Sequence, residues 1–174
     1  FRCKTQIALS GATTMQILQR LKTFFDTRQG GTHTKKKIMI ISAGTNDALG
    51  NSGWGKHATG GYGKNRNLSL TAKLAIKNID KIVLLAKTHG YEVKVMSINP
   101  IYQGKTTEKI KTKNDFNDKE KSKNYNNFIK KVNEHISSKY STFNFKSGGE
   151  QVEMLDNIHP STVGSGQLLS NAMS

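Results

Sequence analysis

The sequence has few cysteines, which cross-link a chain, and few prolines, which stiffen it. It contains one cysteine and two prolines in 174 residues, so an internal disulfide and a collagen-like chain are both excluded. It also lacks an apolar run near the roughly 18 residues needed to cross a bilayer. With 34% hydrophobic residues, enough apolar side chain remains for the core of one domain, residues 1–174.

Acidic residues are scarce as well. Lys and Arg number 27 against 12 Asp and Glu, a formal charge of +15. The cations gather in residues 35–37 and 105–123, and such runs are usually solvated faces. The other interpretation is an anionic partner, such as nucleic acid, teichoic acid or an acidic polysaccharide, which a positive field attracts over about a Debye length. Both interpretations stay open.

The apolar pattern of the first half predicts strand, helix and strand. Residues 5–10 form the first expected strand. Met15, Leu18, Leu21 and Phe25 then recur at helical spacing, after a capping box at Thr13 and Gln16. The continuous apolar run in residues 36–42 predicts a strand buried on both faces of a parallel sheet. Residues 43–67 contain seven glycines and favour a long loop that forms a site.

The second half continues the alternation. Residues 68–86 form a long amphipathic helix that Gly90 ends. A strand over 91–98, a helix over 125–136, a weak strand over 142–145 and a helix capped by Ser161 follow. Strands that alternate with helices predict a three-layer α/β/α sandwich with a mainly parallel, flavodoxin-like doubly wound sheet.

Polar residues follow the expected strands at the carboxyl edge of the sheet, where ligands gather. His159 could act as a general base and Asp156 could hold its ring in one tautomer. The Gly11 amide and Asn46 could donate to an oxyanion. Gly44 and Asp47 belong to the loop that supports Asn46.

The remaining aromatic and imidazole residues give weaker signals. Trp54 and Tyr62 could line a groove for a sugar or pack the glycine-rich loop onto the domain. The other histidines have no spacing typical of metal ligands and are expected on the solvated surface: His33, His57, His89 and His135. We expect no metal and no cofactor.

Three strings occur in a specific order: SGATT before a helix, GTND after a buried strand, and DNIHP before the last helix. Together they resemble the second, third and fifth sequence blocks of the SGNH (GDSL-type) esterase and lipase family. The resemblance implies the SGNH hydrolase fold over essentially the whole chain. It also implies Gly11 and Asn46 as oxyanion donors, His159 as the base and Asp156 as its partner.

The family's first block, a Gly-Asp-Ser that carries the nucleophile, does not occur in this sequence. Ser10 and Ser42 do not take its place in the pattern. In the family the missing strand lies between the strands that are here residues 5–10 and 36–42. Its loss would leave buried backbone groups unpaired. We therefore expect a segment upstream of Phe1, or a bound peptide, between these two strands, which would then lie roughly 9 to 10 Å apart.

Two functions follow as hypotheses. The first is a serine ester hydrolase that uses an acyl-enzyme, acts on an acylated carbohydrate or cell-envelope polymer, and is inactive as this chain alone. The second is a structural or binding protein that keeps the fold within a larger assembly, such as a phage particle, without chemistry. A soluble protein is expected, with extracellular and virion-associated locations both left open.

Overall fold

The fold is a parallel sheet with helices on both of its faces. The computed structural model describes residues 7, 11–27, 36–54, 68–102, 118–144, 146–147, 150–154 and 158–173. Strands β1 (Lys37–Ile41), β2 (Tyr91–Met96) and β3 (Thr142–Phe143) run parallel in the order β1-β2-β3. A separate antiparallel hairpin, which the sequence pattern did not predict, joins β4 (Lys146–Ser147) and β5 (Glu150–Gln151).

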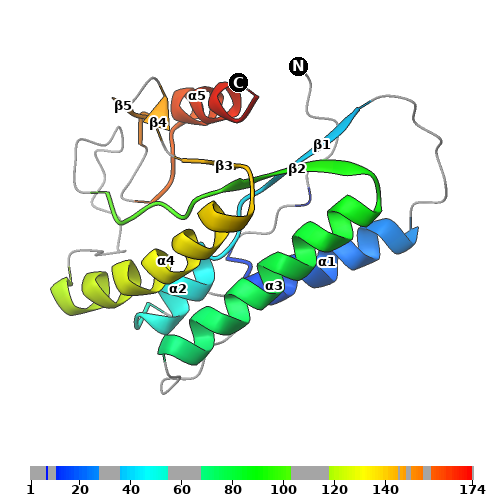
Figure 1. Ribbon diagram of the computed structural model, residues 1–174. Helices are drawn as coiled ribbons and strands as arrows, with labels where there is room; N and C mark the ends of the chain where they lie inside the picture. The colour runs from blue at the N-terminus through cyan, green and yellow to red at the C-terminus, as the bar shows by residue number, and fades with distance from the viewer. Residues whose placement is uncertain are drawn as a thin grey trace.

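The helices are unequally divided between the two faces (Figure 1). One face carries α1 (Thr14–Thr27), α2 (Thr45–Asn51), α3 (Leu68–Thr88) and α4 (Lys119–Lys139). The other carries α5 (Thr162–Met173), which lies beside β3 and β4. This arrangement confirms the predicted three-layer α/β/α class. In the described part of the chain no helix is long and apolar enough to cross a membrane.

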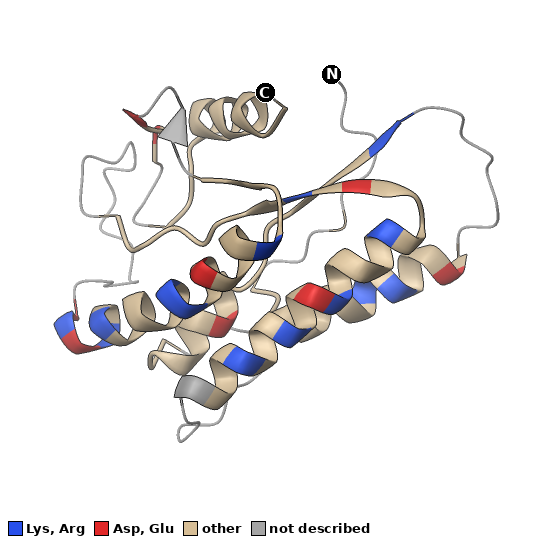
Figure 2. Cartoon of the chain, viewed as in Figure 1, with Lys and Arg blue, Asp and Glu red and all other residues tan. Residues whose placement is uncertain are grey.

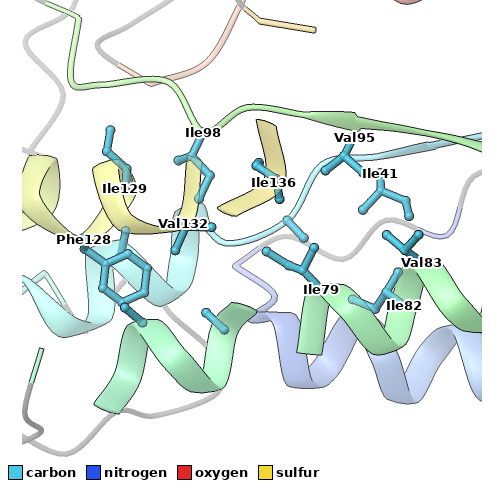
Figure 3. Packing of buried hydrophobic residues seen from close by; sticks show 14 of the residues in the cluster. Ile41, Ile79, Ile82, Val83, Val95, Ile98, Phe128, Ile129, Val132 and Ile136 are labelled. Carbon is cyan, nitrogen blue, oxygen red and sulfur yellow. The ribbon is translucent and has the colours of Figure 1, made fainter. Parts of the chain in front are cut away.

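The core lies between the sheet and α3 and α4 (Figure 3). Ile41 and Val95, which are neighbours in the β1–β2 register, point toward Ile82 and Val83 of α3. The predicted stripe of α4 is buried in full: Tyr125, Phe128, Ile129, Val132 and Ile136. Burying side chains of this size contributes about 1.5–3 kcal/mol each, so this layer holds the helices to the sheet.

The expectation that residues 36–42 are buried on both faces was wrong. Ile41 is 5% exposed, whereas Ile40 on the opposite face is 36% exposed. Alternate residues of a strand point to opposite faces, and Ile40 is paired in register with Lys94. Among the described residues, α5 is the only helix on that face and it lies beside β3. The outer face of β1 is therefore partly exposed.

Both predicted helix starts are confirmed, but one residue on each apolar face is misplaced. The Gln16 side chain accepts a hydrogen bond from the Thr13 amide at 3.0 Å, and Ser161 Oγ accepts one from the Gly164 amide at 3.1 Å. Met15 is 51% exposed and Val163 is 60% exposed. The buried stripe begins one residue before Met15 in α1 and one residue after Val163 in α5. In α1 the buried position belongs to Thr14, and in α5 to Gly164, where an added Cβ would lie 2.0 Å from the Glu153 carbonyl oxygen.

The predicted loop over residues 43–67 needs correction, and most of the predicted strand over residues 5–10 lies outside the described residues. The predicted loop over residues 43–67 begins with helix α2, and Trp54 is only 5% exposed. Trp54 therefore packs into the core, while Tyr62 lies outside the described residues. Of the expected strand over residues 5–10, only Ile7 is described; it lies outside any strand and packs half-buried against the core. The described residues therefore do not test the expected separation between that strand and β1.

Lysine and arginine lie along the outer surfaces of α1, α3 and α4, with fewer acidic residues between them (Figure 2). Most of the lysine-rich segment 105–123 lies outside the described residues, which include its end in the first turns of α4. One of these, Lys121, has its Nζ 6.0 Å from the centre of the Trp54 ring. A partner for this charge remains a prediction.

The expectation that His135 is a solvated histidine was wrong. Its Nε2 lies 2.9 Å from Oδ1 of Asp80, so it links α4 to α3. Tyr140 donates its hydroxyl hydrogen to the same carboxylate, and Lys139 Nζ lies 3.3 Å from it. His89 is exposed as predicted and stacks on Phe25, while His33 and His57 lie outside the described residues.

This cluster should make the fold sensitive to acid. Burial alone would raise the pKa of Asp80, but hydrogen bonds from Tyr140 and His135 outweigh it and hold the pKa below its ordinary value of 3.8. The folded state then binds fewer protons than the unfolded state near this pH, so the stabilisation is present above pH 3.8 and is lost as the pH falls through the lower, folded-state pKa.

We expect Asp80→Asn to lower the free energy of unfolding by about 1–2 kcal/mol at pH 6. The difference from wild type should shrink as the pH falls from about 5 to 3, measured by urea denaturation. Glu134→Gln, an exposed change on α4, is the control and should show neither effect. A difference that does not depend on pH would contradict the assigned role of the carboxylate.

Candidate functional site

The segment after β1 turns sharply at Gly44 and enters α2. Gly44 has a φ of +107°, and an added Cβ would lie 2.6 Å from Cδ1 of Ile98. The left-handed backbone therefore favours glycine here, and any added Cβ would also force the Ile98 side chain to shift. The turn places Thr45, Asn46 and Asp47 in the first turn of α2 at the carboxyl end of β1.

Asn46 lies against the turn that precedes α1. Its Nδ2 donates a hydrogen bond to the carbonyl oxygen of Ala12 at 2.9 Å. Ala12 follows Gly11, which has a φ of +72°. The bond uses one of the two hydrogens on Nδ2 and fixes the plane of the half-buried amide. The structure thus brings the segment of Gly11 together with Asn46, although the two are 35 positions apart in the printed sequence.

Asp47 is fully buried and holds the start of α1. Its two carboxylate oxygens accept hydrogen bonds from the Thr14 amide at 2.8 Å and the Thr14 hydroxyl at 2.7 Å. Thr14 Oγ1 accepts a further bond from Asn78 of α3 at 3.2 Å. A carboxylate at a helix N-terminus also interacts favourably with the helix dipole. Asp47 therefore ties α2 to α1, and Thr14 extends the connection to α3.

Sequence reasoning missed Thr14 and Asn78 as members of this network. Asn78 lies within the apolar stripe of α3, next to Ile79, and is only 7% exposed. A polar residue at such a position needs a hydrogen-bond partner, and this was the signal available in the sequence. The signal does not name the partner, which lies 64 residues away along the chain.

Helix α4 fixes the neighbouring segment after β2. The side-chain amide of Asn133 makes two bonds of 2.8 Å to Ile98, one to its N–H and one to its carbonyl. The Tyr125 hydroxyl donates to the Asn99 carbonyl at 2.9 Å. Burial raises the pKa of Tyr125, with a hydrogen bond to Thr45 acting in the opposite direction. The phenol therefore stays protonated as a donor, and the chain beyond β2 is held at three points.

His159 lies on the short segment before α5 and its side chain is exposed. The segment is anchored directly after His159. Pro160 forms an antiparallel bridge with Met154, and the Ser161 amide donates to the Glu153 carbonyl at 3.0 Å. Asp156 lies outside the described residues, so its pairing with His159 stays a prediction. Among the described residues no group of His, Cys, Asp and Glu could hold a metal ion.

Comparison with known proteins gives a consistent result. The family model described as GDSL-like lipase/acylhydrolase matches residues 4–170. A solved structure of a GDSL-like lipase from Bacteroides thetaiotaomicron is similar in fold, with a TM-score of 0.54 and 19% sequence identity. The alignment covers 92% of this chain and 69% of that chain. The search among curated proteins finds no match.

The network at Asp47 generates a prediction about stability. Asp47→Asn keeps the shape of the side chain but points an N–H₂ group at one of the two Thr14 donors. We expect it to lower the free energy of unfolding by about 1–3 kcal/mol, because a buried donor loses its acceptor. Urea denaturation followed by circular dichroism measures the change. Asp26→Asn, exposed near the end of α1, is the matched control, and an equal effect of both changes would contradict the network.

Proposed function

The chain belongs to the family of GDSL-like lipases and acylhydrolases, and from that premise we propose that it forms an acyl-enzyme on an ester of a carbohydrate or cell-envelope polymer. At the level of the family, the activity is carboxylic ester hydrolysis. The observation that carries the proposal is the 2.9 Å bond from Asn46 to the Ala12 carbonyl. This bond holds a side-chain amide beside the Gly11 turn, where two N–H donors are needed.

The proposed donors act on the charge that develops during the reaction. Attack on an ester carbonyl converts its oxygen into an oxyanion, and donors already in position stabilise that charge without reorganisation. One donor is the N–H of Gly11 and the other is the second hydrogen on Asn46 Nδ2. The bond from Asn46 to Ala12 and the buried Asp47 next to it support this role, because they restrict the motion of the amide.

The proton transfers are assigned to His159. The serine Oγ attacks the carbonyl carbon while His159 takes its proton, and the leaving alcohol departs with that proton. Water then attacks the acyl-serine by the same route and releases the acid. Asp156 is proposed to hold the imidazole in the required tautomer.

The nucleophile is proposed to come from a segment upstream of Phe1 that carries Gly-Asp-Ser, because this string is absent from residues 1–174. The sheet supports the proposal. Within the described residues β1 pairs only with β2, so no described strand lies along its other edge. An added strand on that edge would place its carboxyl end near the turn at Gly44.

The absent serine equally motivates the second hypothesis, a structural or binding protein without chemistry. The two hypotheses differ in what they require of Asn46 and His159. Hydrolysis requires both side chains, whereas a scaffold requires only that the fold is kept.

His159→Ala tests the general base. In the complete protein we expect the rate of p-nitrophenyl acetate hydrolysis to fall by about 10³-fold or more, because the nucleophile loses the group that removes its proton. His89→Ala, which changes an exposed histidine directly after α3, is the matched control. An unchanged rate in His159→Ala would exclude the proposed mechanism and favour the scaffold.

Asn46→Ala tests the oxyanion donor. We expect kcat for p-nitrophenyl acetate to fall by about 10²–10³-fold with little change in KM, because the donor acts mainly in the transition state. Asn127→Ala, exposed on α4, should keep wild-type kinetics. If instead KM rose and kcat stayed constant, Asn46 would be a ground-state binding residue.

A further inference from the structure

A hollow of about 250 Å³ opens at the carboxyl end of β2, beside β3. Among the described residues, none of those that line it is charged. Amide side chains dominate its wall, with Asn99, Asn133, Asn144 and Gln151 around it and the Ser97 hydroxyl at its edge. Pro100, which is exposed, adds an apolar surface, whereas the Ile98 side chain is turned into the core. The hollow is smaller than the 300–1,000 Å³ of drug-sized sites, so it suits one small ring.

The amides of this wall are not equivalent. The oxygen and the nitrogen of the Asn133 side chain each already make a hydrogen bond, and both bonds go to the backbone of Ile98. In contrast, Nε2 of Gln151 is buried and has no hydrogen-bond partner. A buried donor without an acceptor is destabilising and is rare in native proteins. Gln151 therefore needs an acceptor from outside the described chain.

Two further polar groups line the same space. Among the described residues no hydrogen bond engages the side chains of Ser97 or Asn99. The Asn99 backbone is nevertheless fixed, since its carbonyl accepts from Tyr125 at 2.9 Å. A hydroxyl and two amides, held by strands and by α4, thus face one hollow with unused hydrogen-bonding capacity.

We propose that this hollow is a subsite for a neutral sugar ring. A sugar offers hydroxyl groups that both donate and accept, which amides can match, and C–H groups that fit the apolar surface of Pro100. The described lining residues are all uncharged and so favour a neutral ligand over a phosphate or carboxylate, despite the chain's net charge of +15. The role assigned to this sugar, as the carrier of the scissile ester, rests on the proposed hydrolase function, because both lie at the carboxyl edge of the sheet.

Binding tests the subsite without any chemistry. Methyl glycosides of glucose, galactose and N-acetylglucosamine are titrated into the ¹⁵N-labelled chain. We expect at least one to shift the amide resonances of residues 97–99 and 151. Gln151→Leu should weaken that glycoside at least tenfold while the melting temperature stays equal or rises, because the variant removes an unsatisfied buried donor. Gln19→Leu, exposed on α1, should bind as wild type does.

The subsite is overturned if no glycoside shifts these resonances, or if Gln151→Leu binds as tightly as wild type. A melting temperature that falls sharply together with binding would also overturn it, since Gln151 would then be structural. Asn99→Ala gives a second reading, and we expect it to weaken the same glycoside severalfold with the fold intact.

Kinetics on the complete protein separates this inference from the hydrolase proposal. If the subsite holds the sugar of the substrate, Gln151→Leu should lower kcat/KM for an acetylated methyl glycoside about tenfold and leave p-nitrophenyl acetate hydrolysis unchanged. Equal rates on both substrates would overturn the subsite but not the hydrolase. Glycoside binding by a complete protein that cleaves neither ester would support the subsite and overturn the hydrolase.

Discussion

The carboxylate of Asp47 is fully buried, and three helices are joined around it. An ionised group in the interior is tolerated only where hydrogen bonds replace its lost hydration. Here the replacement comes from the amide and hydroxyl of Thr14, at 2.8 and 2.7 Å, in the first turn of α1. Asn78 of α3 completes the set through the Thr14 hydroxyl. The start of α1 and the first turn of α2 can therefore occupy only one relative position, and this position sets Asn46 against Ala12.

The edge of the sheet is positioned from the helical side. Helix α4 holds the segment after β2 through Asn133 and Tyr125, and the Ile98 side chain of that segment packs against Gly44. The segments after β1 and β2 are thus fixed against each other without a disulfide or metal in the described chain. Rigid neighbours of this kind are what a preorganised set of donors needs, because a donor that must move on binding loses part of its advantage. The opposite face of β1, where Ile40 is 36% exposed, contributes little to this positioning.

Charge and neutral polar groups lie on different parts of the described chain. Lysine and arginine residues lie along α1, α3 and α4 (Figure 2), whereas the described residues that line the hollow beside β2 are uncharged. Long-range fields affect the rate of encounter with charged polymers, while short hydrogen bonds decide which group fits a site. With the proposed sugar subsite, this division would let the protein approach an anionic surface and still select a neutral group on it. The separation is a property of the fold, since the composition alone gives only the sum of +15.

The sequence by itself determined the order of α1, β1, α3, β2, α4, β3 and α5, both helix caps and the stripes of α3 and α4, because periodicity and capping act over a few neighbouring residues. It also contained the three strings that identify the family. It did not predict α2 or the β4–β5 hairpin. Tertiary structure decided what those patterns contact. Thr14 rather than Met15 is buried because Asp47, 33 residues away, supplies its partners. In the same way, Trp54 is buried in the core, Ile40 is partly exposed and His135 contacts Asp80. A local pattern shows which residues share a face, but burial depends on which distant element covers that face.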